Sequence, residues 1–179
     1  MATRSNVAIQ TDERPLVITR AFNAPRELVW KAFTEKERLE QWWGRPGVTT
    51  RVKTLDVRPG GVFLYSQTLL DNSVMWGKWV YREIVPPQRL VSVVSFCEES
   101  GKIIRAPFAS DWPLEMLAVA TFTEHQGKTT ISVEATAHGA TDAERSTFES
   151  GRGNMEQGFN ATYDRLDEYL ANAQQSARH

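Results

Sequence analysis

The spacing of apolar residues along the chain changes from extended to helical, returns to extended, and ends in a long helical stretch. Leu16–Phe22 alternates with a period of two, which predicts a strand. Residues 25–34 and 34–43 carry apolar side chains three and four positions apart, which predicts two short helices. We expect the second helix to begin with a capping box formed by Thr34 and Glu37.

From Val48 onward the pattern is extended, and turns or loops rich in Gly, Pro, Asp and Asn separate the segments. Six strands are predicted, over residues 49–57, 62–69, 74–85, 90–97, 114–123 and 129–137. The last alternates most cleanly, which is typical of an antiparallel sheet with one covered face. Trp76 and Trp79 have opposite parity in their strand, so at most one of them faces the interior.

The chain closes with a helical pattern that runs to about Asn172 and starts at a capping box of Thr141 and Glu144. The predicted helix is roughly 45 Å long. Gly151, Gly153 and Gly158 are unfavourable inside a helix, each by about 0.5–1 kcal/mol relative to alanine. Two explanations stay open for them, a close approach of the helix to a neighbour or a break near 151–153.

Three segments and the C-terminal ending carry a resemblance to a known family. They are Ala24–Thr34 leading to Trp42-Trp43-Gly44, then Asp56–Gly61, then Gly77–Val91, and finally Gly158–Leu170. In this order they resemble the START/Bet v 1-like helix-grip (SRPBCC) superfamily. Within it, the chain is similar to the bacterial family related to the C-terminal domain of the activator of Hsp90 ATPase.

The resemblance implies an α+β helix-grip fold. In that fold a curved antiparallel sheet of six to seven strands wraps around a long C-terminal helix, with two short helices after the first strand. We expect residues 15–172 to form this single domain, since 179 residues suit one domain. Residues 1–14 are then a flexible lead-in and residues 173–179 a flexible tail.

Composition and charge exclude several classes of function. The net charge of −1 is spread along the chain, so we expect neither nucleic acid nor a membrane surface as a partner. No apolar run approaches the ~20 residues that span a bilayer, and no signal peptide is recognisable, which favours a cytoplasmic protein. Cys97 is the single cysteine, and the three histidines lack metal-ligand spacing. We therefore expect no disulfide, no metal and no cofactor.

The fold implies a cavity between the sheet and the C-terminal helix, and such concave apolar spaces are the usual small-molecule sites. The six tryptophans are the one compositional excess, and they suit either a core or a pocket wall. The residues predicted to bind a ligand are aromatic or Met side chains: Trp43, Phe63, Trp76, Trp79, Phe96, Phe108, Met116, Met155 and Phe159.

Three functions are compatible with these residues. The first is binding of a small hydrophobic or aromatic molecule, which we favour over an enzyme. The second is a cyclase- or hydrolase-like enzyme that uses Glu115 or a tyrosine as acid or base. We assign no catalytic residue, because Glu115 lies at a strand end and we expect Tyr65, Tyr81 and Tyr163 to hold their hydroxyls in water.

The third function is an Hsp90 co-chaperone-like role, which only the family resemblance motivates. The superfamily also includes lipid carriers, hormone receptors, polyketide cyclases and stress-related proteins, so the resemblance predicts architecture better than chemistry. A homodimer and a chaperone contact stay open as partners.

Overall fold

The computed structural model describes residues 14–177, which form a seven-stranded antiparallel sheet and four helices. The elements follow one another in the order β1 (Leu16–Phe22), α1 (Arg26–Thr34), α2 (Lys36–Trp42), β2 (Thr49–Leu55), β3 (Val62–Thr68), β4 (Val74–Val85), β5 (Arg89–Cys97), β6 (Glu115–His125), β7 (Lys128–His138), α3 (Asp142–Ser150) and α4 (Arg152–Ser176).

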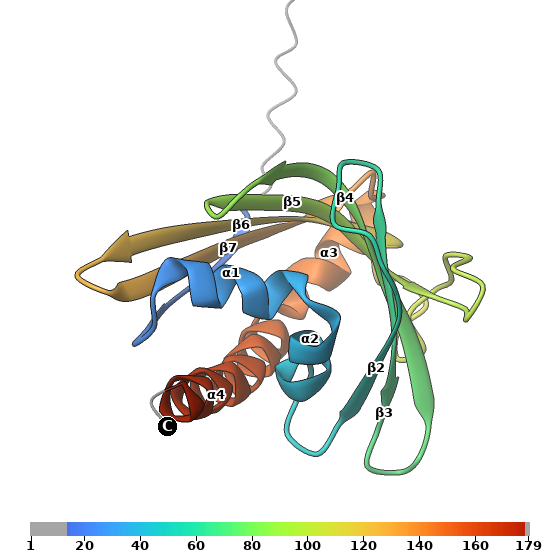
Figure 1. Ribbon diagram of the computed structural model, residues 1–179. Coiled ribbons are helices and arrows are strands. Elements are labelled where there is room, and N and C mark those ends of the chain that lie inside the picture. Colours follow the sequence, from blue (N-terminus) through green and yellow to red (C-terminus); the bar gives the residue numbers. More distant parts are fainter. Residues whose placement is uncertain (1–13, 178–179) are drawn as a thin grey trace, which may run out of the picture.

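The sheet has the strand order β1-β7-β6-β5-β4-β3-β2, so the first two strands of the chain lie at opposite edges. The helices α1 and α2 connect these edges and cross one face of the sheet. Figure 1 shows the sheet curving around α1, α2 and α4, which all lie on its inner face. The α+β helix-grip fold is therefore present, with seven strands.

The predicted alternation is confirmed in β7 and β4. Ile131, Val133, Ala135 and Ala137 on β7 are buried on the inner face, whereas Glu134 between them is exposed. In β4 the opposite parity of the two tryptophans also holds, since Trp79 is buried and Trp76 is only half-buried.

The core lies between the inner face of the sheet and the three covering helices. Its largest fully buried side chains come from both the sheet and the helices, among them Trp42, Tyr81, Tyr163, Phe22 and Phe63. The Trp42 indole also donates a hydrogen bond of 2.9 Å to the Ala32 carbonyl, so this buried donor is satisfied.

The capping box predicted at Thr34 is wrong. Thr34 is the last residue of α1, and its hydroxyl donates to the Trp30 carbonyl one turn back. Glu35 is the N-cap of α2 and makes no side-chain cap bond, because its carboxylate pairs with Arg38. The capping box at Thr141 is confirmed, since the Thr141 hydroxyl accepts from the Glu144 amide at 3.2 Å.

The single long helix predicted from Thr141 is interrupted at Gly151, which separates α3 from α4. At the break the chain lies close to Trp112, because a Cβ added at Gly151 would lie 2.8 Å from its indole ring. The glycine thus admits a tryptophan from the β5–β6 loop at the helix junction. Beyond the break, α4 continues to Ser176, past the expected Asn172.

The flexible lead-in predicted for the N-terminus lies outside the described residues, apart from Arg14. Within residues 14–177, none of the helices is both long and apolar enough to cross a membrane.

Candidate functional site

A partly open cavity of about 110 Å³ lies between the inner face of the sheet and α4. Strands β4 to β7 supply most of its wall, and the helical side closes it with Phe33 of α1 and with Phe159 and Tyr163 of α4. The full lining is Phe33, Trp43, Trp79, Leu90, Ser92, Val94, Met116, Ala118, Ala120, Val133, Ala135, Phe159 and Tyr163.

Small side chains on three neighbouring strands leave the space for this cavity. In the sheet register Ser92 on β5 pairs with Ala118 on β6, and Ala118 pairs with Ala135 on β7. All three point to the same face, so they form one row of small residues across the sheet. The aromatic rings opposite do not reach this row, which therefore forms the floor of the cavity.

A second, smaller chamber of about 90 Å³ adjoins the first, and Val94 and Met116 line both of them. The other residues of this outer chamber are Tyr65, Gly77, Ser95, Phe96, Trp112 and Pro113. Trp112 is the same side chain that packs against Gly151, so the outer chamber reaches the junction of α3 and α4.

The polar groups of the two chambers are few and uncharged. Among residues 14–177, no Asp, Glu, Lys, Arg or His lines either chamber. Burial raises the pKa of Tyr65 to about 12, and it also raises the pKa of Tyr81 and of Tyr163. These hydroxyls are consequently neutral near pH 7.

The loop that carries Trp43 is fixed from two sides. Arg165 on α4 donates to the carbonyls of Gln41 and Gly44 at 3.0 Å each, and the Thr50 hydroxyl donates to the Trp43 carbonyl. This bonding holds Trp43 at the cavity, where its ring meets that of Trp79 edge to face with centroids 5.0 Å apart.

Four of the nine residues predicted to bind a ligand line the inner cavity. They are Trp43, Trp79, Met116 and Phe159.

The other five lie elsewhere. Phe63 is wholly buried behind Trp79, with ring centroids 5.0 Å apart. Met155 packs against the core from α4. Phe96 lines the outer chamber, and it also lines a surface groove together with Trp76 and Phe108. Trp76 is there because it has the opposite parity to Trp79, and Phe108 is there because its loop leaves it 62% exposed.

The tyrosines differ from the expectation that their hydroxyls reach water, because Tyr65, Tyr81 and Tyr163 are all buried. Sequence reasoning also missed the row of small residues, Phe33 and Leu90. The alternating alanines of β6 and β7 carried a signal for the row, since small inward residues on adjacent strands open space. Glu115 lies at the start of β6 and does not line either chamber.

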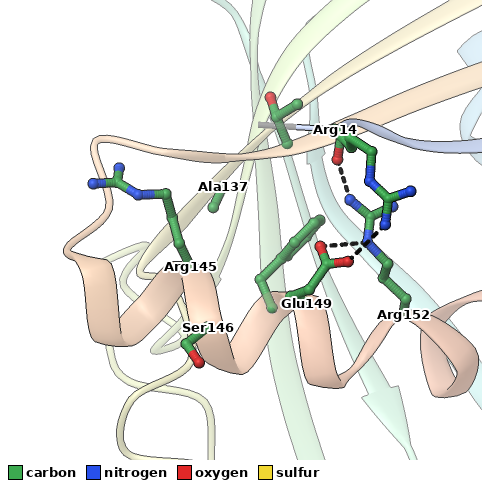
Figure 2. Close-up of a pocket in the computed structure, with 8 residues that line it drawn as sticks. Arg14, Ala137, Arg145, Ser146, Glu149 and Arg152 are labelled. Carbon is green, nitrogen blue, oxygen red and sulfur yellow. Dashed lines mark hydrogen bonds and ion pairs between the residues drawn. The ribbon is translucent and has the colours of Figure 1, made fainter. Parts of the chain in front are cut away.

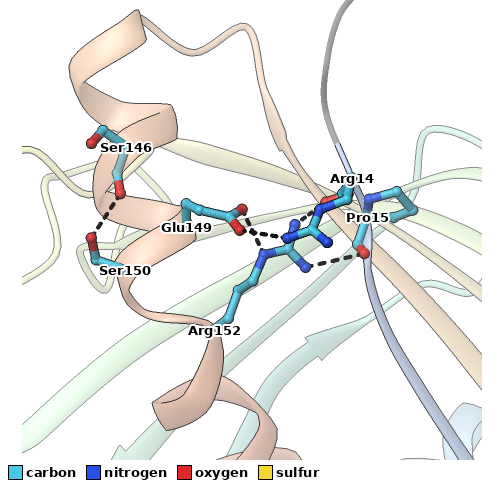
Figure 3. Close-up of polar contacts among 6 residues, drawn as sticks. All are labelled: Arg14, Pro15, Ser146, Glu149, Ser150 and Arg152. Carbon is cyan, nitrogen blue, oxygen red and sulfur yellow. Dashed lines mark hydrogen bonds and ion pairs between the residues drawn. The ribbon is translucent and has the colours of Figure 1, made fainter.

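A larger and more open pocket of about 490 Å³ lies beside α3 and is lined by charged side chains (Figure 2). There Glu149 accepts from Arg152 at 2.6 Å and from Arg14 at 3.1 Å. Arg152 also donates to the backbone carbonyls of Arg14 and Pro15, as Figure 3 shows. We call this group the Arg14–Glu149–Arg152 clamp, and it ties the start of β1 to the α3–α4 junction.

The remaining arginine of this pocket, Arg145, extends away from the clamp in Figure 2. It donates to the Asp142 carboxylate at 2.8 Å and to the Ala140 carbonyl at 2.7 Å. The arginines of the pocket are thus engaged with protein groups, which indicates a structural role. Within the described part of the chain, no group of three or more His, Cys, Asp or Glu residues could hold a metal ion.

Comparison with known proteins gives a family match. The family model described as Activator of Hsp90 ATPase homolog 1-like protein matches residues 23–171. No curated protein matches the chain.

Among solved structures, protein Ms6760 from Mycobacterium smegmatis is 27% identical, with a TM-score of 0.68 over 86% of this chain and 88% of that one. A protein from Arthrobacter aurescens is 23% identical, with a TM-score of 0.72 over 87% and 85% of the two chains. DynU16, described as a putative protein in the dynemicin biosynthetic locus, is 20% identical, with a TM-score of 0.60. This match covers 88% of this chain but 47% of DynU16, and it shows a shared fold.

Proposed function

The chain belongs to the Activator of Hsp90 ATPase homolog 1-like family, and from this premise and the cavity we propose that it binds a small, uncharged hydrophobic or aromatic molecule. The observation that carries the proposal is the chamber between sheet and α4, whose wall is almost wholly apolar. Concave apolar spaces with a few polar groups are typical ligand sites.

The volume of the chamber limits the size of the ligand. Typical sites for drug-sized ligands occupy roughly 300–1,000 Å³. Here the inner chamber measures about 110 Å³ and the outer chamber about 90 Å³. Because an apolar cavity of about 150 Å³ holds benzene, a molecule with one ring suits the two adjoining chambers only when they are taken together. A larger ligand requires the helical wall to move.

The chemistry of the lining favours binding over acid–base catalysis. A general acid or base works best with a pKa near the operating pH. The raised pKa of Tyr65, about 12, makes its hydroxyl a poor proton donor and its phenolate scarce at pH 7. Since Glu115 lies outside both chambers, the enzyme hypothesis has no carboxylate there.

Ligand-dependent stabilisation tests this proposal. Toluene at ten times its dissociation constant should raise the free energy of unfolding by about 1.4 kcal/mol, measured by chemical denaturation. Ala118→Leu fills the space above the floor of the cavity and should abolish this increase in the free energy of unfolding. Val17→Leu adds bulk at an exposed position of β1 and should retain it. Absence of the gain in the unsubstituted protein, or its persistence in Ala118→Leu, would contradict the proposal.

A further inference from the structure

We propose that the surface groove lined by Trp76, Phe96 and Phe108 is the entrance to the cavity, and that Phe108 controls how fast a ligand passes. This inference rests on the proposed function, and it assigns the route by which a ligand reaches the same site.

The groove and the two chambers follow one another along β4 and β5. On β4, Trp79 lines the inner chamber, Gly77 the outer chamber and Met75 the groove. On β5, Val94 lines both chambers, and Phe96 lines the outer chamber and the groove. Along each strand these residues are two positions apart, so they lie on the same face of the sheet. The three spaces therefore form one line, which covers roughly 13 Å from Trp79 to Met75.

The groove is the wide end of this line. Its volume is about 580 Å³, whereas the outer chamber measures about 90 Å³ and the inner chamber about 110 Å³. Glu98 is the one charged residue that lines the groove among residues 14–177, and most of the other side chains there are apolar. A hydrophobic molecule can therefore leave water in the groove before it enters the chambers.

Phe108 lies between the groove and the outer chamber. Its ring is edge to face with Phe96, with centroids 5.6 Å apart, and with Trp112, with centroids 5.5 Å apart. Phe96 and Trp112 line the outer chamber, whereas Phe108 lines the groove and neither chamber. Because Phe108 is 62% exposed, little protein lies outside its ring to hinder a movement away from this wall.

The stretch that carries Phe108 has few bonds to the rest of the fold. In the described part of the chain, residues 106–111 make hydrogen bonds only within their own loop. The Ala109 amide donates to the Ala106 carbonyl at 3.4 Å, and the Trp112 amide donates to the Ala109 carbonyl at 3.3 Å. Segments with few bonds to other elements open at a small cost in free energy.

The two ends of this stretch are fixed. Arg105 donates to the Trp112 carbonyl at 3.3 Å, which ties the ends to each other. Arg105 also pairs with Glu144 at 3.6 Å, which joins them to α3. A movement of residues 106–111 therefore displaces Phe108 and leaves Trp112 in place.

The helical side of the cavity is held more firmly. Arg165 on α4 donates to four backbone carbonyls of residues 41–48, at 3.0 to 3.3 Å. These bonds join α4 to the loop that carries Trp43. The β5–β6 loop is consequently the part of the wall that we expect to open for entry.

Fluorine NMR with fluorobenzene measures the passage, because exchange between the free and bound signals gives both rate constants. Phe108→Ala removes the ring and should raise the association and dissociation rate constants by about threefold to tenfold, the factor expected from the loss of one or two aromatic contacts. The dissociation constant should stay nearly unchanged, since Phe108 lines neither chamber.

Two further variants sharpen the test. Met75→Trp enlarges a side chain that lines the groove and neither chamber, so it should lower both rate constants at an unchanged dissociation constant. Leu114→Ala removes an exposed apolar side chain at the end of the same loop that lines none of the three spaces. It should leave both rate constants unchanged.

The outcomes separate the entrance from the proposed function. Unchanged rate constants in Phe108→Ala, unchanged rate constants in Met75→Trp, or an increase in Leu114→Ala equal to that in Phe108→Ala would overturn the entrance and leave apolar binding standing. If fluorobenzene does not bind to the unsubstituted protein, the proposed function fails and the inference fails with it.

Discussion

The inner cavity and the Arg14–Glu149–Arg152 clamp differ in the kind of polar groups that they contain. In the clamp, one carboxylate pairs with two guanidinium groups, and backbone carbonyls take further donors. In the cavity, the polar groups are uncharged, and the indole N–H groups of Trp43 and Trp79 lie beside the Tyr65 hydroxyl. The larger pocket therefore pairs its own charges, whereas the smaller one has a wall that is almost wholly apolar. The chemistry of the lining separates the two pockets better than their volume does.

Adding a charge to each region should give the largest contrast. Ala135→Asp places a carboxylate in the apolar cavity and should lower the free energy of unfolding by about 3 kcal/mol or more. Thr136→Asp is the neighbouring residue beside the arginine-lined pocket and should cost under about 1 kcal/mol. Urea denaturation measures both, and equal losses would refute the contrast.

Alkaline pH should also act on the cavity. Between the usual tyrosine pKa of about 10 and the value of about 12 for Tyr65, the unfolded chain loses a proton that the folded protein keeps. Stability therefore falls as the pH rises through this window. Tyr65→Phe should make that slope shallower by about 1.4 kcal/mol per pH unit. Denaturation at several alkaline pH values gives the free energy of unfolding against pH for both proteins. Parallel curves would show that Tyr65 does not contribute to this pH dependence.

Two glycine substitutions near the α3–α4 junction probe the place where the outer chamber and the Arg14–Glu149–Arg152 clamp meet. Gly151→Ala forces a methyl group against Trp112 and should destabilise the protein by about 1–3 kcal/mol. Gly153→Ala meets nothing within 4 Å and should stabilise it by up to about 1 kcal/mol. Thermal unfolding compares them, and the same sign for both would contradict the close approach of Trp112 to Gly151.

The smallest effect is expected in the clamp itself. A hydrogen bond from Arg152 holds the pKa of Glu149 below its usual value. The ionised Glu149 therefore stabilises the folded protein at any pH above the usual carboxyl pKa, and this stabilisation is lost as the pH falls through the lowered pKa. Glu149→Gln should remove this dependence in acid, with less change in thermal stability than the other substitutions because the pair is solvent-exposed. A loss as large as that of Ala135→Asp would contradict the comparison.

Local patterns predicted much of the fold from the sequence. Alternation alone separated Trp79 from Trp76, and it identified the inward residues of β7. Features that depend on distant partners were not predicted. The glycine at the helix break accommodates Trp112 from the β5–β6 loop, and Thr34 could close one helix as well as begin another.

The same difference between local patterns and long-range contacts applies to the cavity. Its aromatic wall was partly predictable, because Trp43 continues the apolar spacing of α2 and Phe159 lies on the apolar side of α4. The floor was not, since the row of Ser92, Ala118 and Ala135 exists only once three strands adopt their register. The aromatic cluster at the cavity follows from contacts between Trp43, Tyr65 and Trp79, which no local sequence pattern encodes.

The pairing of β1 with β7 has a consequence for how the chain folds during synthesis. Leu16 pairs with Ala135 and Phe22 with Thr129. The first strand to leave the ribosome therefore cannot form these pairs until the last strand of the sheet has been synthesised. Contacts between such distant residues slow folding, because a long loop must close before they form. We therefore expect the β2–β5 hairpins to assemble first, and the sheet to gain its final edge only when β7 has emerged.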